Sequence, residues 1–384
     1  ASLAVSGTTD LGADVTTVGT QTYGGITTVS VASTLATTNS NITFNNTIVG
    51  DGGADGLTLN MGSGIVEFNG AVGGTAIGAI AITGGLNLDA AITSATSLTV
   101  STTSNLGASV TTSGVQTYTG NSTLSSNGAL NFTGTTVSFL GTVAGDGGND
   151  EEVTITGNAI FGDATTDTVT GLEELTITGN TTIETTTITT VDTQTYGDTA
   201  NSDTLTLGTN VVMTTGTAAG DDITFNSILN SDNTGDERNL TLTAEDVIFN
   251  GTVGQTLDLG IIDITGNLDL NADIGNTGGV AGAASLDVSG TTDLGADVTT
   301  VGAQVYGGVT TISADSILAT TDTAITFNNT IVGDLSDDDL TINIGTGIVQ
   351  FKGTVGAGGG VNDVGAIAIT GGLNLDAAIT SAAS

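Results

Sequence analysis

Apolar residues occupy nearly every second position along much of this chain. The stretches LTLTAEDVIF (240–249), TLDLGIIDITGNLDLNADI (256–274) and TTIETTTITTVDT (181–193) show the alternation. A period of two is typical of β-strands, in which successive side chains point to opposite faces. Ile, Val and Thr favour the extended backbone, and the intervening Gly, Asn and Asp favour tight turns. No segment shows an apolar helical stripe with caps, so the pattern predicts an all-β chain.

The chain also repeats itself over a long period. The stretch ASLAVSGTTDLGADVTTVGTQTYGGITTVS at Ala1 returns as ASLDVSGTTDLGADVTTVGAQVYGGVTTIS at Ala284, so the numbering shifts by 283 (284 − 1). The likeness continues through ITFNNTIVGD to GAIAITGGLNLDAAITSA. We therefore expect one long period at 1–283, and the start of the next at 284–384 as a near-copy of 1–97.

Aromatic residues mark a shorter repeat inside the long one. Three degenerate units, at about 1–97, 98–183 and 184–283, carry the same markers in the same order, as does 284–384. A tyrosine after Gln-Thr or Gln-Val comes first: Tyr23, Tyr118, Tyr196 and Tyr306. Two phenylalanines follow it: Phe44 and Phe68, Phe139 and Phe161, Phe225 and Phe249, and Phe327 and Phe351. We expect these rings in the core or at corners rather than on a sugar-binding surface.

A fixed order of markers with variable spacing predicts a parallel β-helix, or β-solenoid, with loops of different length on its surface. Each turn would hydrogen-bond to the next at roughly 4.8 Å. With about 20 residues a turn, the chain would form on the order of 18 turns and an elongated rod of roughly 90 Å. Open strand edges recruit further strands, so we expect more chain or another subunit to continue the coil.

The chain is strongly acidic. Its net charge is −38, and Arg238 and Lys352 are its two basic residues. Nucleic acids and anionic membrane surfaces would be repelled rather than attracted. No apolar run of about 18 residues could span a bilayer, and no signal-peptide pattern begins at Ala1. We expect no nucleic-acid partner and no membrane insertion within this segment, which we interpret as a mature part of something longer.

The composition also argues against catalysis. The chain has no Cys and no His, which excludes disulfides, thiolate metal sites and Ser-His or Cys-His catalysis. A carboxylate pair alone can hydrolyse a glycosidic bond, but acidic sugars would need basic residues near one another. A near-copy of the first unit in the next long period implies many equivalent sites, which suits a scaffold better. We expect no enzyme activity.

Acidic, glycine-containing loops recur at one place in every unit. They read DGGADG from Asp51, DGGNDEE from Asp146, SDNTGDER from Ser231 and DLSDDD from Asp334. Ca²⁺ takes six to eight oxygen ligands, which such loops can supply. The candidate ligands are Asp51, Asp55, Asp146, Asp150, Glu151, Asp232, Asp236, Asp334, Asp337 and Asp339, with the best at Asp146, Asp150, Glu151, Asp334, Asp337 and Asp339. The alternative is that these are solvated turns that keep the protein soluble.

The phrases GTTDLGADVTTVGTQTYGG, ITFNNTIVGD and ITGGLNLDAAIT resemble the repeats of large secreted bacterial proteins of the filamentous haemagglutinin and autotransporter adhesin type. The resemblance covers nearly the whole chain and lies in the style of the repeats. It implies a right-handed β-helix exported to the cell surface, where it would serve as an adhesin, a matrix component or a fibre.

These observations favour a non-catalytic extracellular protein that builds or extends a cell-surface fibre, sheath or biofilm matrix by association with copies of itself. An alternative is the stalk of a secreted adhesin, with a host or neighbouring-cell surface ligand as its partner. A third is an ice-binding or glycan-binding module, which would need one flat, regular face. Like-charged rods repel over about a Debye length, so bundling would need divalent cations or a bridging partner.

Overall fold

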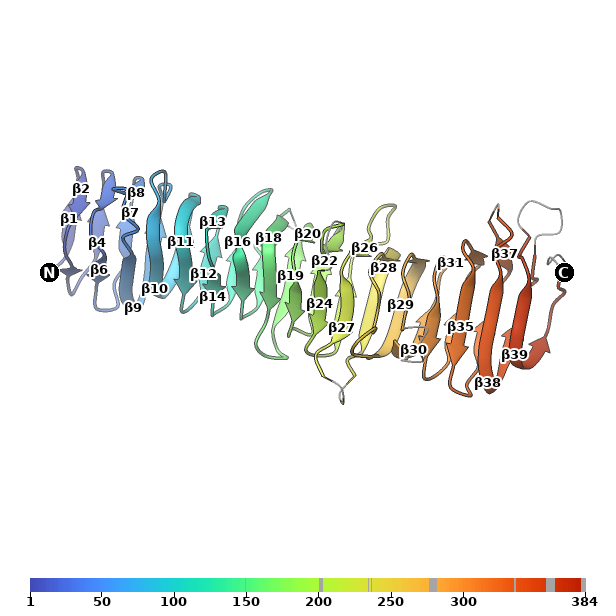
Figure 1. Cartoon of the computed structure of the whole chain (residues 1–384). Helices are drawn as coiled ribbons and strands as arrows, with labels where there is room; N and C mark the ends of the chain where they lie inside the picture. Colours follow the sequence, from blue (N-terminus) through green and yellow to red (C-terminus); the bar gives the residue numbers. More distant parts are fainter. Residues whose placement is uncertain are drawn as a thin grey trace. The chain divides into compact units, whose positions relative to one another are not determined.

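The computed structural model is an all-β chain of parallel strands (Figure 1). It describes residues 1–148, 150–199, 203–233, 235, 237–275, 282–334, 336–356 and 363–380. This part of the chain contains no helix, and its strands stack as a β-solenoid of about 16 turns. The predicted fold class, a parallel β-solenoid, is confirmed, whereas the right-handed sense of the coil stays a prediction.

Two compact units divide the chain, Ala1–Asn180 with Glu184–Thr190, and Thr181–Ile183 with Val191–Ser384. The strands of the first unit are β1 (Leu3–Val5), β2 (Thr9–Leu11), β3 (Val15–Thr16), β4 (Gln21–Tyr23), β5 (Thr27–Val29), β6 (Ser33–Ala36), β7 (Ile42–Phe44), β8 (Ile48–Gly50), β9 (Leu57–Phe68), β10 (Ile77–Leu88), β11 (Ile92–Val100), β12 (Ser104–Leu106), β13 (Val110–Thr112), β14 (Gln116–Tyr118), β15 (Ser122–Leu124), β16 (Leu130–Phe139), β17 (Val143–Gly145), β18 (Glu152–Phe161), β19 (Thr168–Leu172), β20 (Glu174–Ile177) and β22 (Thr187–Thr190).

The strands of the second unit are β21 (Thr181–Ile183), β23 (Gln194–Tyr196), β24 (Thr204–Leu207), β25 (Val211–Thr214), β26 (Ile223–Phe225), β27 (Ile228–Ser231), β28 (Leu240–Phe249), β29 (Leu259–Leu270), β30 (Ala283–Val288), β31 (Thr292–Leu294), β32 (Val298–Thr300), β33 (Gln304–Tyr306), β34 (Thr310–Ile312), β35 (Ser316–Thr320), β36 (Ile325–Phe327), β37 (Ile331–Gly333), β38 (Leu340–Phe351) and β39 (Ile367–Leu375).

A turn of the coil contains up to three strands, and a long strand such as β9 pairs with both β6 and β7. In the first unit β4, β5 and β6 form a turn, and β7, β8 and β9 pair with them in parallel and in the same order. In β5 and β8 the first and third residues are buried while the middle one is partly exposed, as alternation requires. Because each turn lies in register on the last, side chains at matching positions form rows through a narrow core of Leu, Ile and Val.

Four columns of aromatic rings run through this core. Tyr23 stacks on Phe44 with ring centroids 4.9 Å apart, and Phe44 lies 5.7 Å from Phe68. The other columns are Tyr118 with Phe139 and Phe161, Tyr196 with Phe225 and Phe249, and Tyr306 with Phe327 and Phe351. All of these rings are buried. The interpretation of the aromatic markers as core residues is therefore confirmed.

The length of a turn varies more than a uniform repeat would predict. Leu3 pairs with Gln21, a step of 18 in the numbering (21 − 3), whereas Gln194 pairs with Ile223, a step of 29 (223 − 194). The extra length of the longer turn lies in loops, including the exposed stretch 217–220. For this reason the chain forms about 16 turns rather than the expected 18 or so.

Candidate functional site

Four acidic loops leave the coil at the same place in its turn. They follow β8, β17, β27 and β37 and precede β9, β18, β28 and β38. Their predicted common position is therefore confirmed. Asp236 lies outside the described residues, and the other candidate ligands can be placed. The four loops differ in the groups that hydrogen-bond to or neutralise their carboxylates. This difference decides which loop could bind a metal ion.

The first loop satisfies its leading aspartate from its own backbone. The N–H of Gly53 donates to Asp51 Oδ1 at 2.9 Å, which closes a tight turn on the surface. Asp51 is exposed and Asp55 partly exposed, so water can solvate both. Nothing in this loop brings a third carboxylate to them, because Gly56 closes the loop.

The third loop neutralises its aspartate with arginine. Arg238 Nε and Nη2 donate to the two carboxylate oxygens of Asp232 at 2.9 and 3.2 Å. This two-pronged geometry is the one in which guanidinium and carboxylate match best. A cation would have to displace Arg238 to reach Asp232, so this loop is a poor metal site.

The fourth loop satisfies its aspartates with serine and backbone groups. The N–H of Ser336 donates to Asp334 Oδ1 at 2.6 Å, and Ser336 Oγ lies 2.6 Å from the same oxygen and 2.7 Å from Asp338 Oδ2. The hydroxyl first, and then the N–H, hold the pKa of Asp334 below its usual range. Asp339 accepts the N–H of Ala366 at 2.6 Å, and Asp337 is exposed. The structure does not bring Asp334, Asp337 and Asp339 together as one group.

The second loop is different, because it gathers three carboxylates and buries one of them. One oxygen from each of Asp146, Asp150 and Glu151 lies within 4.8 Å of the others. Asp146 is exposed, Asp150 is partly exposed, and Glu151 is fully buried with 0% exposure. The N–H of Asp146 donates to Glu151 Oε1 at 3.2 Å. Burial first, and then the nearby carboxylates of Asp146 and Asp150, raise the pKa of Glu151 against the lowering effect of that N–H.

A second group of three carboxylates was not found from the sequence. Asp222, Glu245 and Asp246 lie close together in the second unit. Glu245 accepts the N–H of Gly220, and Asp246 accepts Asn267 Nδ2 at 2.9 Å. The signal was present in GDDITF and AEDVIF, because Asp222 and Asp246 each stand three residues before a marker phenylalanine. Parallel stacking of β26 on β28 then brings them together.

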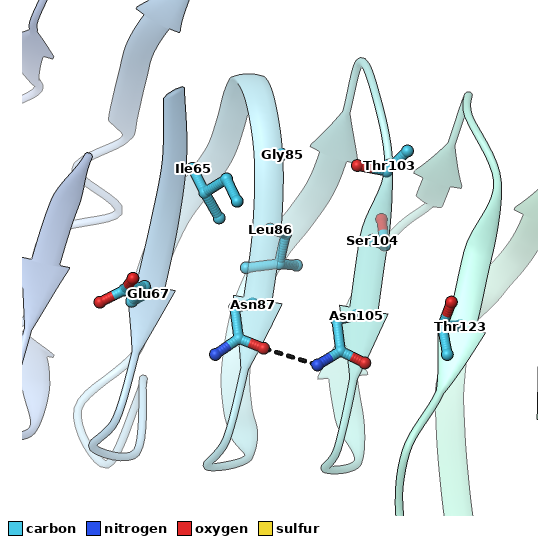
Figure 2. Close-up of a pocket in the computed structure, with 9 residues that line it drawn as sticks. All are labelled: Ile65, Glu67, Gly85, Leu86, Asn87, Thr103, Ser104, Asn105 and Thr123. Carbon is cyan, nitrogen blue, oxygen red and sulfur yellow. Dashed lines mark hydrogen bonds between the residues drawn. The ribbon is translucent and has the colours of Figure 1, made fainter. Parts of the chain in front are cut away.

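A shallow groove of about 350 Å³ lies on the outside of the first unit (Figure 2). It is lined by Ile65, Glu67, Gly85, Leu86, Asn87, Thr103, Ser104, Asn105 and Thr123. Glu67, Asn87, Asn105 and Thr123 occupy paired positions in four successive turns. Asn105 Nδ2 donates to Asn87 Oδ1 at 2.7 Å, as Figure 2 shows.

The polar groups of this groove support the stack of turns. Glu67 accepts Thr43 Oγ1 at 2.9 Å and Asn41 Nδ2 at 3.2 Å, so its carboxylate is held by the preceding turn. Together with the amide ladder of Asn87 and Asn105, this ties neighbouring turns along the surface. Asn and Thr are common throughout the chain, so nothing in the sequence distinguishes these residues.

A similar groove of about 250 Å³ lies in the second unit. It is lined by Asp246, Asn267, Leu268, Asp269, Thr291, Thr292, Asp293 and Thr311. Burial raises the pKa of Asp269, and the charge of Asp293 one turn on raises it further against a hydrogen bond from Asn271. Asp269 and Asp293 occupy positions equivalent to Asn87 and Asn105 of the first groove, so the second groove carries more carboxylates.

No protein-family model, curated protein or solved structure matches this chain. The described residues include no helix with the length and apolar character needed to cross a membrane.

Proposed function

We propose that this protein is a non-catalytic structural β-solenoid that builds or extends an extracellular fibre, sheath or matrix by associating with copies of itself. The observation that carries the proposal is a strand register that repeats with the sequence. Leu3 pairs with Gln21, and Leu286 pairs with Gln304, each position shifted by 283 (286 − 3). The next two pairings along the coil return with the same shift.

Because the strand pairing of one long period returns in the next, the coil can be extended by adding periods that have the same core side chains. Every added period pairs with the last as earlier periods did, and it presents the same side chains to a neighbouring copy. An enzyme or a single-ligand receptor has no use for this repetition, whereas a fibre gains length and equivalent contacts from it.

Exposed apolar side chains recur with the same period and supply a contact surface. Val18 is 66% exposed and Val301 is 51% exposed, and their numbers differ by the same 283 (301 − 18). Ile65 and Ile348 form a second such pair, with exposures of 41% and 54%. Single exposed apolar residues are ordinary, but repetition at one place in the period is what lateral contact between copies would use.

The proposal includes a place among secreted bacterial proteins of the filamentous haemagglutinin and autotransporter adhesin type, and a location at the cell surface. The β-solenoid supports this because it is the fold that the resemblance of the repeats implies. A net charge of −38 sets a condition on assembly. Copies repel one another within a Debye length of about 8 Å at physiological salt, so association needs salt or bridging cations.

Electron microscopy and sedimentation of the purified chain test the proposal at rising ionic strength, with Ca²⁺ and after chelation. We expect filaments or large assemblies, which the double variant Val18→Ser with Val301→Ser weakens. Val31→Ser is the matched control, because Val31 is 50% exposed but its counterpart in the next period is Ala314. Separate particles under every condition would overturn self-association and favour the stalk of an adhesin.

A further inference from the structure

The loop at 146–151 holds a carboxylate in a place where its charge is not satisfied by the protein. Glu151 is 0% exposed, and its Oε2 has no hydrogen-bond partner. Asp150 Oδ1 is likewise buried without a partner. Removing ionised groups from water is strongly unfavourable unless a counter-charge replaces the lost solvent. The two basic side chains of the chain, Arg238 and Lys352, lie in other turns of the coil.

The turn itself does not need the buried glutamate, as the sister loop at 51–56 shows. The N–H of Gly148 donates to Asp146 Oδ1 at 3.1 Å, just as the N–H of Gly53 donates to Asp51 Oδ1 at 2.9 Å. Gly147 and Gly52 adopt nearly the same positive φ, 109° and 106°. Asp150 corresponds to Asp55, and Glu151 corresponds to Gly56. The same turn therefore forms with and without a carboxylate at its last position.

The backbone beside Glu151 is shaped to admit its carboxylate. A Cβ on Gly145 would lie 2.6 Å from Glu151 Oε2 and would collide with the carbonyl of Gly171. The N–H of Glu173 donates to the carbonyl of Glu151 at 3.1 Å, which fixes the backbone from the next turn. Glu151 Oε2 is thus held against the backbone at Gly145 rather than turned out to water.

We propose that Asp146, Asp150 and Glu151 bind one Ca²⁺. Two oxygens that ligate one Ca²⁺ at about 2.4 Å can lie at most about 4.8 Å apart. The three carboxylate oxygens meet this limit, since all lie within 4.8 Å of one another. The donor set is entirely oxygen, which suits a hard cation, and the exposed side of Asp146 leaves room for water to complete the shell.

The charges of the loop agree with this assignment. Asp146 and Asp150 both disfavour the ionised form of Glu151, and burial disfavours it further. A divalent cation would reverse these effects, because it neutralises two of the three negative charges and gives the buried carboxylate of Glu151 a counter-charge.

The group formed by Asp222, Glu245 and Asp246 is the competing location, and it fits less well. Asp222 Oδ1 is buried without a partner, as Glu151 Oε2 is, but all three residues of this group are partly exposed, whereas Glu151 is 0% exposed. Glu245 and Asp246 accept donors from Gly220 and Asn267. Asp222→Asn is therefore a useful comparison variant, because it removes a carboxylate from the other cluster while the proposed site is untouched.

Calorimetric titration of CaCl₂ into the chelator-treated full chain, at physiological ionic strength, tests the proposal. We expect one saturable site that Glu151→Gln weakens by about tenfold or more, since ligand charge sets calcium affinity. Asp55→Asn in the sister loop and Asp222→Asn should bind as the wild type does. At one Ca²⁺ concentration, Ca²⁺ should also raise the melting temperature of the wild type more than that of Glu151→Gln. No saturable heat in the wild type, or loss of binding in Asp222→Asn with retention in Glu151→Gln, would overturn the assignment.

A gain-of-site variant keeps the test decisive if Glu151→Gln fails to fold. Gly56→Glu places a glutamate in the sister loop, where a Cβ would lie 3.1 Å from the carbonyl of Ala79 and needs a small adjustment. We expect a second Ca²⁺ site in this variant, and unchanged stoichiometry would contradict the role given to Glu151. Both measurements compare the affinity and stoichiometry of Ca²⁺ between variants that keep Val18 and Val301, so they stand or fall separately from self-association.

Discussion

A glutamine and a tyrosine, two residues apart, form a buried polar pair at four places in the coil. Tyr118 Oη donates to Gln116 Oε1 at 3.2 Å, and Gln116 Nε2 donates to the carbonyls of Val110 at 3.1 Å and Thr133 at 2.8 Å. The pairs at Tyr23, Tyr196 and Tyr306 are joined to their glutamines in the same way, at 2.9, 2.9 and 3.0 Å. One amide thus joins its own turn to the next and satisfies a phenol in the core. This explains why Gln-x-Tyr recurs.

Gln116→Leu should destabilise this part of the coil more than Tyr118→Phe does. The leucine variant leaves the Tyr118 hydroxyl and two carbonyls without their partner, at a cost of about 3 kcal/mol, whereas loss of the hydroxyl alone costs about 1 kcal/mol. Hydrogen exchange at β14 and at Thr133 measures the local opening free energy. Equal protection in the two variants would show that the amide contributes nothing beyond its bond to tyrosine.

The sequence predicted the position of the acidic loops but not their differences. Alternation and repeats locate a loop between two strands, yet they do not say what approaches it from the next turn. Asp232 meets Arg238, Asp334 meets Ser336, and Glu151 turns inward beside Gly145. Arg238 and Ser336 stand in the loop sequences SDNTGDER and DLSDDD themselves, so these two pairings depend on how each loop folds. The inward turn of Glu151 depends on Gly145 and on the backbone packed beside it, which the loop sequence does not contain.

At the scale of the strand, parallel register sets the spacing of the aromatic columns. Tyr118 pairs with Phe139, and Phe139 pairs with Phe161, so one ring lies on another in successive turns. Their centroids are 4.8 and 6.2 Å apart, near the separation of neighbouring strands. The rings stack because the strands do, and each column joins three turns.

Removal of the middle ring of a column should open the coil locally. Phe139→Ala leaves a cavity between two buried rings, and we expect a loss of about 3–5 kcal/mol in opening free energy. Because turns in a solenoid contact their nearest neighbours, exchange should accelerate in β14, β16 and β18 while β4 keeps its protection. Phe139→Leu is the control, with a loss of about 1 kcal/mol. Faster exchange throughout the first unit after Phe139→Ala would mean that the coil opens as a whole.

Strand identity and order were predictable, and turn length was not. Period-two patterning and the fixed order of Tyr and Phe markers reflect burial and register, which every turn must satisfy. The long turn from Gln194 to Ile223 includes surface loops whose length the core does not restrain. A uniform turn of about 20 residues therefore predicted a solenoid with too many turns.

At the scale of the whole molecule, in-register stacking places like charges beside one another. Asp263 pairs with Asp287 and Asp269 with Asp293 across neighbouring turns. Burial raises the pKa of several carboxyls, and neighbouring carboxylates add to the effect. These carboxyls are Glu151, Asp222, Asp258, Asp269, Asp287 and Asp297. The pKa of Asp322 and Asp334 is lowered instead, by hydrogen bonds from Thr346 and Ser336. Because the pKa is raised in more of these carboxyls than it is lowered, we expect the raised group to dominate the response of stability to pH near neutrality.

The chelator-treated protein should therefore become more stable as the pH falls from 7 to about 5. A carboxyl with a raised pKa binds its proton in the folded state before the unfolded chain does, so its contribution is present at low pH and is lost as the pH rises through the folded value. Stability should fall again below the ordinary aspartate value of about 3.9, where Asp322 and Asp334 take up protons.

Melting temperature against pH is the measurement, and Asp269→Asn should flatten part of the rise. Added salt should stabilise the protein more at pH 7 than at pH 5, because screening relieves the same repulsion. A melting temperature that falls steadily from pH 7 to 5 would mean that hydrogen bonds to carboxylates outweigh their burial and mutual repulsion.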